Sequence, residues 1–365
     1  MATSSHDSLT SSAFSVTAVP ITVLQIFIPI MAWGIINNSL LVIMVIREKI
    51  FHKPTFYLLC NQAIANVICL ASILTFSLIM TGAVDSPRVV NVTLQQSIKF
   101  EGIRSSCSLT FMFYQSSYTV SVLSLAVIAF DRHRVLTNYN KKNYSTKSIL
   151  IINTFIWIIG CVNGYFYSTF IGHNRIIKTL CDFNFDSILL ARIYFAINFV
   201  LTYLIPAIII ITSYSLIIRY IRMERSEIAS IDRIKRKRRN HIIEMAMVTS
   251  LVFLIPTTPW AIYSLILAFF QFNVSSLILR NNYSLIVLLP VFQFLYYTTC
   301  VTTPCLVASY NRIIKSIFVS IYLFFLPKKW QNAVVNFKVL SCKIFHSVGD
   351  NYNQSHSVAA IAAVK

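Results

Sequence analysis

The sequence predicts an all-α protein, a seven-transmembrane helix bundle with a short amphipathic eighth helix. Hydrophobic residues make up 56% of the 365-residue chain and charged residues only 12%, a composition typical of membrane proteins. The uncharged stretch at 316–327 is too short to cross a bilayer, so we expect it to lie at the membrane surface. Seven other stretches lack Lys, Arg, Asp and Glu and exceed the roughly 20 residues that a span needs: 20–46, 54–84, 105–130, 148–174, 193–218, 245–279 and 281–311.

Positive charge is distributed unevenly between the two sides of such a bundle. The segments after the first, third, fifth and seventh spans contain 24 of the 31 Lys and Arg residues, and the other segments contain 7. Because basic residues favour the cytoplasmic side, we expect a multi-pass protein of the plasma membrane with its amino terminus outside the cell. Residues 1–19 would form a disordered outer tail, residues 20–326 the membrane domain and residues 327–365 a cytoplasmic tail.

A net charge of +19 would suggest nucleic acid as the partner of a soluble protein, but in a membrane protein the location of the charge matters more than its size, and we expect the lipid bilayer and no nucleic acid as a partner. The basic run at 233–239, RIKRKRR, has no interleaved aromatic residues, so we interpret it as a lipid-facing patch on a cytoplasmic loop. The spans contain no cluster of His, Asp, Glu and Cys for catalysis or metal binding and no internal repeat typical of transporters. We therefore expect no enzymatic activity, no metal and no cofactor.

Amide side chains interrupt the first two spans. An amide within lipid is costly unless another helix pairs with it, so we expect Asn38 of the first span to hydrogen-bond with Asn66 of the second. Asn61 and Gln62 lie closer to the inner end of the second span, where we expect water or lipid headgroups to satisfy them.

The third span connects two chemically distinct ends. Cys107 precedes Asp131 by 24 residues, which corresponds to roughly 36 Å of helix, whereas the hydrocarbon core is about 30 Å thick. One straight helix would therefore place Cys107 at one membrane face and the Asp131–Arg132 pair at the other. Tyr114 and Tyr118 recur at helical spacing with Arg132, so they share its face. That face is either a binding surface or an aromatic packing stripe.

Two cysteines lie on the side that the topology places outside the cell. Cys107 begins the third span and Cys181 lies in the loop after the fourth, whereas the other six cysteines fall in spans or in the cytoplasmic tail. A Cys107–Cys181 disulfide is the economical inference in an oxidising compartment. Asparagines in Asn-x-Ser/Thr sequences on the same side are expected glycosylation sites: Asn91, Asn273 and Asn282.

Prolines occur inside the last three spans. Proline within a spanning helix frees a carbonyl and bends the helix, so the kinks either shape a static bundle or indicate a moving one. We favour the moving bundle because the kinks fall in three neighbouring spans. The prolines are Pro206 in the fifth span, Pro256 and Pro259 in the sixth, and Pro290 and Pro304 in the seventh.

Over residues 20–326, the chain resembles the rhodopsin-type (class A) G-protein-coupled receptors. Asn38 matches the asparagine of the first helix, and Cys107 and Cys181 match the family's disulfide pair. Asp131–Arg132–His133 matches its Asp-Arg-Tyr motif with His in place of Tyr. Within the family, TVSVLSL before DRHR resembles the neuropeptide Y, neuropeptide FF and orexin receptor group. Landmarks of helices four to seven also match: Trp157, Pro206, Tyr214, Phe253, Pro259 and Pro304.

The chain departs from the family pattern at positions that usually act in activation. Asn66 stands where the family has an aspartate that binds sodium, and Thr257 stands where it has a tryptophan. The seventh-helix motif Asn-Pro-x-x-Tyr is replaced by TPCLV at 303–307, which lacks both Asn and Tyr. These changes suit a divergent receptor, one with high basal activity, or a decoy that binds without signalling.

The resemblance implies a receptor, and we expect its ligand to be an extracellular neuropeptide that enters between spans three, six and seven. Tyr114 replaces the carboxylate of amine receptors, and Tyr297 replaces the Schiff-base lysine of opsins. Acids of the outer loops could attract a basic peptide, although solvated loop acids are commoner: Asp85, Glu101, Asp182 and Asp186. Polar and aromatic residues would line the pocket: Tyr114, Gln115, Tyr118, Trp260, Tyr263 and Gln293.

The resemblance also implies a heterotrimeric G protein as partner. Asp131 would hold Arg132 at rest, and ligand would favour an outward swing of span six that opens a cleft beside Arg132. A small-molecule or odorant chemoreceptor of the same fold and a non-signalling decoy are the alternatives. The residues expected to act in coupling and activation are Asp131, Arg132, Tyr214, Phe253, Pro259 and Pro304.

Overall fold

Within the part of the chain that the computed structural model describes, seven helices are long and apolar enough to cross a membrane. The structure describes residues 27–47, 54–84, 93–137, 145–173, 181–184, 187–227, 233–270, 283–310, 314–316 and 318. Residues 314–316 and 318 are helical, at the start of the predicted eighth helix, and the rest of that helix lies outside the described residues. The chain divides into two units, Met1–Tyr310 and Asn311–Lys365, and the seven helices belong to the first.

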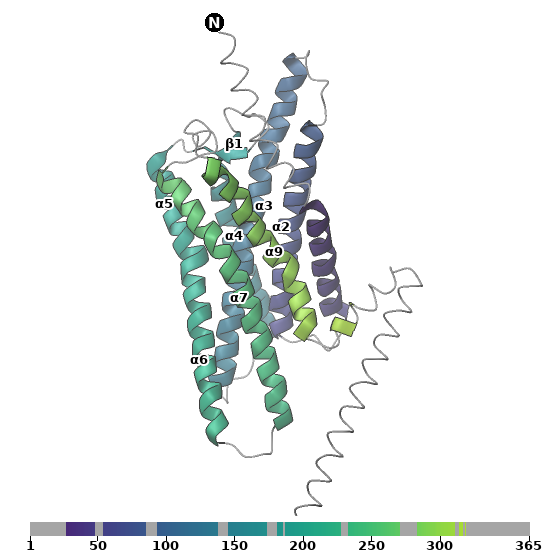
Figure 1. The fold of residues 1–365 in the computed structure, drawn as a ribbon, viewed down its shortest axis with the longest axis vertical. Helices are drawn as coiled ribbons and strands as arrows, with labels where there is room; N and C mark the ends of the chain where they lie inside the picture. The colour runs from purple at the N-terminus through teal and green to yellow at the C-terminus, as the bar shows by residue number, and fades with distance from the viewer. Residues whose placement is uncertain are drawn as a thin grey trace, which may run out of the picture. The chain divides into compact units, whose positions relative to one another are not determined.

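The helices run side by side along the bundle, and a small hairpin lies at the end where α5 begins (Figure 1). The first helix spans Phe27–Arg47. It is followed by α2 (Pro54–Val84), α3 (Thr93–Thr137), α4 (Thr146–Thr169), β1 (Ile171–His173), β2 (Cys181–Phe183), α5 (Ile188–Phe199), the π-helix η2 (Val200–Leu204), α6 (Ile205–Glu227), α7 (Arg233–Phe270) and α9 (Tyr283–Tyr310). Together α5, η2 and α6 form one continuous span, Ile188–Met223.

Several boundaries differ from the sequence-based prediction. The helices α3 and α7 begin at Thr93 and Arg233, within segments predicted as loops, because charged residues end a lipid-spanning stretch without ending a helix. The predicted fourth span is shorter than expected, since α4 ends at Thr169 and Ile171–His173 forms β1. At its start, α4 is capped by Ser145, whose hydroxyl accepts a hydrogen bond from the Ser148 amide at 3.1 Å.

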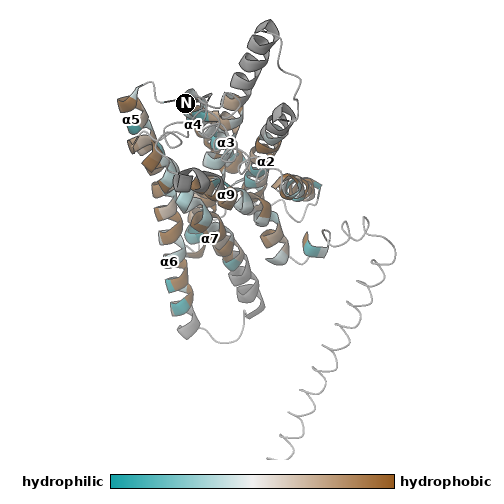
Figure 2. Cartoon of the chain, turned by 45° about the horizontal axis from the view of Figure 1, so that its top comes forward, coloured by the Kyte–Doolittle hydropathy of each residue, from teal (hydrophilic) through white to brown (hydrophobic). Residues whose placement is uncertain are grey.

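The most deeply buried span is α3. Of its most apolar 18 residues 72% are buried, against 22% for α4. Large apolar side chains cover the outer surfaces of the bundle, and brown hydrophobic residues are prominent on α5 and α6 in Figure 2. This inversion of a soluble protein's pattern fits a bundle whose surface faces lipid and whose axis carries the polar groups.

Glycines of α4 allow it to pack closely against α3. A methyl group at Gly164 would overlap the hydroxyl of Ser116 and the carbonyl of Met112. One turn away, a methyl group at Gly160 would lie 2.9 Å from the carbonyl oxygen of Ser116 and 2.8 Å from the side chain of Val120. Small residues at helix crossings allow such backbone approach in membranes, so these two positions set the distance between α3 and α4.

We predict that Gly164→Ala lowers the stability of the purified protein by about 1–3 kcal/mol, because the extra methyl group forces the two helices apart. Gly172→Ala in the hairpin is the control, since its methyl group would meet its nearest neighbour at an ordinary 3.4 Å. Thermal unfolding in detergent measures both variants. Equal melting temperatures for Gly164→Ala and the unchanged protein would contradict the close α3–α4 packing.

Candidate functional site

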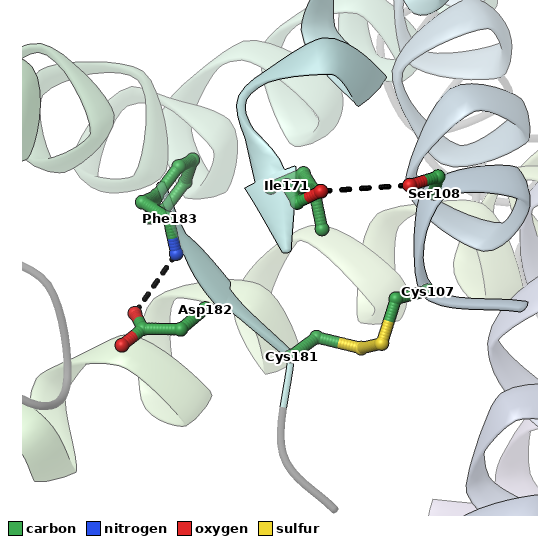
Figure 3. Close-up of a disulfide and its surroundings, with 6 residues drawn as sticks. All are labelled: Cys107, Ser108, Ile171, Cys181, Asp182 and Phe183. Atoms are coloured by element: carbon green, nitrogen blue, oxygen red, sulfur yellow. Dashed lines mark hydrogen bonds between the residues drawn. A yellow bond between two sulfur atoms is a disulfide. The ribbon is translucent and has the colours of Figure 1, made fainter. Parts of the chain in front are cut away.

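A disulfide ties one end of α3 to the hairpin. Cys107 and Cys181 are bonded, with their Cα atoms 5.9 Å apart, as the sequence predicted. The strands β1 and β2 pair antiparallel with Gly172 opposite Asp182, and the Ser108 hydroxyl donates to the Ile171 carbonyl at 3.5 Å (Figure 3). A covalent bond and a hydrogen bond therefore hold the hairpin to α3. We call this end of the bundle the disulfide end.

Aromatic side chains fill the bundle below the hairpin. Tyr114 of α3 is completely buried, and its ring lies 6.1 Å from Trp260 of α7 and 5.3 Å from Tyr296 of α9. Tyr118, one turn further along α3, contacts Tyr296 at 5.4 Å and Phe253 of α7 at 6.3 Å. We define the aromatic cluster as Tyr114, Tyr118, Phe253, Trp260, Tyr263, Tyr296 and Tyr297. It connects α3, α7 and α9 through edge-to-face and stacked ring contacts.

The cluster brings together four of the six residues predicted to line the pocket. Trp260 contacts Tyr114 at 6.1 Å and Tyr263 at 6.4 Å, and Tyr118 joins through Tyr296. Gln115 instead points to α5, where its amide donates to the Asn198 side-chain oxygen at 3.2 Å. Gln293 is half-buried on α9, beside Phe292. The role of these six residues in ligand binding stays a prediction.

A chain of buried amides and hydroxyls crosses the bundle at a deeper level. The Asn66 amide donates to the Asn38 side-chain oxygen at 3.2 Å, as predicted. Asn38 in turn donates to the carbonyl of Cys300 on α9 at 2.9 Å, and Ser121 of α3 donates to Asn66 at 3.3 Å. We call these residues the amide network. It joins the first helix, α2, α3 and α9.

Asn61 has partners that the sequence did not reveal. Its amide donates to Ser124 of α3 at 2.9 Å, and its oxygen accepts from the Trp157 indole of α4 at 2.8 Å. The prediction that water or headgroups satisfy Asn61 was wrong, because α3 and α4 pack over this face of α2. Gln62 is also fully buried within the bundle.

The far end of α3 holds a buried carboxylate between two guanidinium groups. Asp131 is 1% exposed and forms ion pairs with Arg132 and with Arg134, the latter at 3.5 Å. The Arg132 pair matches the prediction, whereas Arg134 was missed although its i,i+3 spacing on a helix signals such a contact. Nearby on α6, the Tyr214 hydroxyl lies 3.3 Å from the Ser250 hydroxyl of α7. We call this end the arginine end.

The fifth span contains a π-helical turn just before Pro206. The turn covers Val200–Leu204, and such bulges are frequent at functional sites. Its Tyr203 hydroxyl forms a hydrogen bond with Thr258, which lies between Pro256 and Pro259 of α7. Thr257, at the family's tryptophan position, is completely buried, and its hydroxyl donates to the Phe253 carbonyl at 2.9 Å. The bulge therefore contacts the proline-containing part of α7.

Several predicted sites cannot be placed. Asn91, Asn273 and Asn282 lie outside the described residues, so their glycosylation stays a prediction.

Of the remaining residues predicted to act in activation, Pro259 is half-buried in α7 and Pro304 is buried in α9. Three residues that make contacts inside the bundle were not singled out from the sequence: Asn198, Tyr296 and Asn163, whose amide donates to the Thr119 hydroxyl at 2.9 Å. Asn198 and Asn163 interrupt apolar spans, and the argument applied to Asn38 would have found them.

These features lie in order along α3, with the disulfide at one end, the aromatic cluster and amide network inside, and the buried ion pair at the other end. The family described as 7 transmembrane receptor (rhodopsin family) matches residues 37–306. The chain therefore belongs to the rhodopsin-type seven-transmembrane receptors, a family of receptors and not of enzymes.

The chain is also similar to a peptide receptor of an insect. The tachykinin-like peptides receptor 86C of Drosophila melanogaster is 26% identical over 245 residues, which cover 63% of this chain. The matched part spans about 45% of that relative's length.

The amide network does not fit the sodium ion that the family's aspartate binds. Asn66 is neutral, its amide nitrogen donates to Asn38, and its oxygen accepts from Ser121. A cation buried at this depth needs a negative charge nearby, and Asn66 supplies none. At this position, hydrogen bonds between neutral groups therefore join the first helix, α2, α3 and α9.

We predict that replacing sodium chloride by choline chloride leaves the melting temperature of the purified receptor unchanged. Asn66→Asp should be less stable than the unchanged protein in choline and should regain stability in sodium, because a buried carboxylate requires a counter-charge. Thermal unfolding in the two salts at equal ionic strength measures this. Sodium-dependent stabilisation of the unchanged receptor would contradict the prediction.

Proposed function

We propose that this chain is a plasma-membrane receptor for an extracellular peptide and that it signals through a heterotrimeric G protein. The observation that carries the proposal is the buried Asp131–Arg132 pair, at the opposite end of α3 from the hairpin-bearing disulfide. Buried ion pairs in membrane proteins are costly and mark functional positions. Membership of the rhodopsin family supports the same role.

The proposed orientation places the disulfide end outside the cell and the arginine end in the cytoplasm. The excess of Lys and Arg in the segments at the arginine end supports it. A disulfide also belongs in an oxidising compartment. In this orientation Asn91, Asn273 and Asn282 would be available for glycosylation, and a ligand would approach through the hairpin toward the aromatic cluster.

A peptide ligand is supported by the name of one relative, the tachykinin-like peptides receptor 86C. That similarity favours a peptide receptor in general and does not favour the neuropeptide Y, neuropeptide FF and orexin group. Tyr114 at the position of the amine receptors' carboxylate also argues against an amine held by α3.

A ligand bound at the aromatic cluster would affect the arginine end through a movement of α7. Trp260 and Phe253 lie on α7 on either side of Pro256 and Pro259, so a ligand that shifts these rings would bend or straighten the helix near its prolines. Tyr203 and Ser250 give α7 polar contacts with η2 and α6 that could exchange during this movement. An outward position of the start of α7 would expose Arg132 to a G protein.

Two other functions fit the same fold. A small-molecule or odorant chemoreceptor is favoured by the dense aromatic cluster, in which Tyr114 has no exposed surface. A decoy that binds without signalling is favoured by Thr257, Thr303 and Val307 at positions that usually act in activation. The first alternative changes the ligand and the second changes only the response.

A ligand screen separates these functions. Cells expressing the receptor are exposed to amidated neuropeptides and to a small-molecule library, and G-protein dissociation is recorded together with binding at the cell surface. The proposal predicts dissociation by at least one peptide. Responses only to small molecules would support the chemoreceptor, and peptide binding without dissociation would support the decoy.

We predict that Arg132→Ala removes most ligand-driven G-protein dissociation, whereas Arg134→Ala retains it. Both arginines form an ion pair with Asp131, so each variant removes one cationic partner of Asp131, and the two variants differ in the residue offered to the G protein. Responses are normalised to the amount of receptor at the cell surface. An undiminished response in Arg132→Ala would contradict the proposed coupling role.

A further inference from the structure

A buried amide without a hydrogen-bond partner lies on α2. Gln62 is completely buried. Among the residues that the structure describes, none forms a hydrogen bond with its Nε2 or its Oε1 atom. Asn61, the residue before it, uses both ends of its amide, because it donates to Ser124 and accepts from the Trp157 indole. Two consecutive amides of one helix therefore differ in whether the described bundle satisfies them.

The register of α2 against α3 places Gln62 between the amide network and the arginine end. Ser121 of α3 donates to Asn66 at 3.3 Å. The Asn61 amide, closer to the start of α2, donates to Ser124, further along α3, at 2.9 Å. The two helices are therefore antiparallel here, and Gln62 lies at the level of Ser124, one turn of α2 closer to the arginine end than Asn66.

The face of α3 between the amide network and Arg132 is apolar at this level. Leu125 and Ile128 follow Ser121 on that face, and each is 1% exposed. Arg132 comes seven residues after Leu125, roughly 10 Å along the helix. Lipid offers no hydrogen-bond partner to an amide, and these two apolar side chains offer none either. The described arrangement of the bundle therefore leaves the Gln62 amide desolvated.

A desolvated amide opposes the arrangement that buries it. An amide that gives up its hydrogen bonds to water and gains none in the protein costs free energy, whereas an apolar side chain of similar size does not. An arrangement of the bundle that lets water reach Gln62 recovers this free energy. The cleft beside Arg132 is such an arrangement, because it would bring cytoplasmic water to within about two turns of the Gln62 level.

We propose that the Gln62 amide binds water that enters from the arginine end when the cleft beside Arg132 opens, and that this binding shifts the bundle toward the open arrangement. The inference rests on the proposed function, because the opening movement belongs to it. Gln62 thereby sets the fraction of the receptor that is open without a ligand. A residue that only packed α2 against its neighbours would have no such effect.

Replacing the amide by an apolar side chain tests this role. Gln62→Leu and Gln62→Met remove both polar atoms and keep most of the volume. At least one of them should raise the melting temperature of the full-length purified receptor by about 2 °C or more. Asn61→Leu is the matched control, because it removes an amide that has two partners, and it should lower the melting temperature.

A buried reporter on α3 measures the opening without a G protein. Ile128→Cys places a thiol between the level of Gln62 and Arg132, and Leu125→Cys is a second reporter on the same face. The rate of modification by a water-soluble methanethiosulfonate, followed by mass spectrometry of the α3 peptide, shows how often water reaches this layer. Adding the more stable of the two Gln62 substitutions should slow the modification by about 5-fold or more, because the open arrangement becomes rarer.

Basal G-protein dissociation in cells, normalised to the receptor at the cell surface, should fall by a similar factor in the same Gln62 variant. If the melting temperature rises and modification slows, but the unchanged receptor dissociates no G protein under any condition, the role of Gln62 in opening stands and the proposed coupling fails. A melting temperature raised by neither Gln62 variant, including loss of folding in both, would overturn the inference. A modification rate that the Gln62 substitution leaves unchanged, or a measurable basal dissociation that it leaves unchanged, would overturn it as well.

Discussion

The structure depends on one constraint, which is that lipid supplies no hydrogen-bonding partner to a polar side chain. Polar groups within the spans must therefore turn inward and find partners on neighbouring helices. The helix α3 supplies many of these partners. Its Ser121 and Ser124 form hydrogen bonds with amide side chains of α2, and its Thr119 hydroxyl accepts a hydrogen bond from Asn163 of α4 at 2.9 Å. Its central position follows from its polarity.

The same constraint arranges different chemistry at successive levels of α3. A covalent bond and a hairpin lie at one end, aromatic rings follow, amides come next, and the Asp131 ion pairs occupy the other end. The rings and the amide network meet α9 one turn apart, at Tyr296 and at the carbonyl of Cys300. A displacement of α9 relative to α3 would therefore disturb both levels together, which gives the bundle a physical route between its ends.

Features that depend on burial alone could be predicted from the sequence. The Asn38–Asn66 hydrogen bond followed from the cost of an amide in lipid, and the Cys107–Cys181 bond followed from topology and compartment. The seven spans followed from uncharged length. In each case the type of residue and its depth in the membrane left few possible partners or environments.

Features that depend on which helix covers a given face could not be predicted. Asn61 was assigned to water because nothing in its local sequence reveals that Trp157 of α4 lies over it. The complete burial of Tyr114 depends on the rings of α7 and α9, more than 140 residues away in the chain. The hairpin strands have three residues each, too few for a pattern of alternation. The π-helix is a change of hydrogen-bond register, which side-chain composition does not encode.

The most direct test of the inward-pairing constraint is a double-mutant cycle on the amide network. Asn38→Ala, Asn66→Ala and the double variant are compared by unfolding of the purified receptor, with Asn38→Ala and Asn163→Ala as a control pair from separate hydrogen-bond networks. If lipid forces the two amides to pair, Asn38 and Asn66 should show a coupling free energy of about 0.6 kcal/mol, up to about 1.7, and the control pair should be additive. Additive losses for Asn38 and Asn66 would contradict the inward pairing of polar side chains.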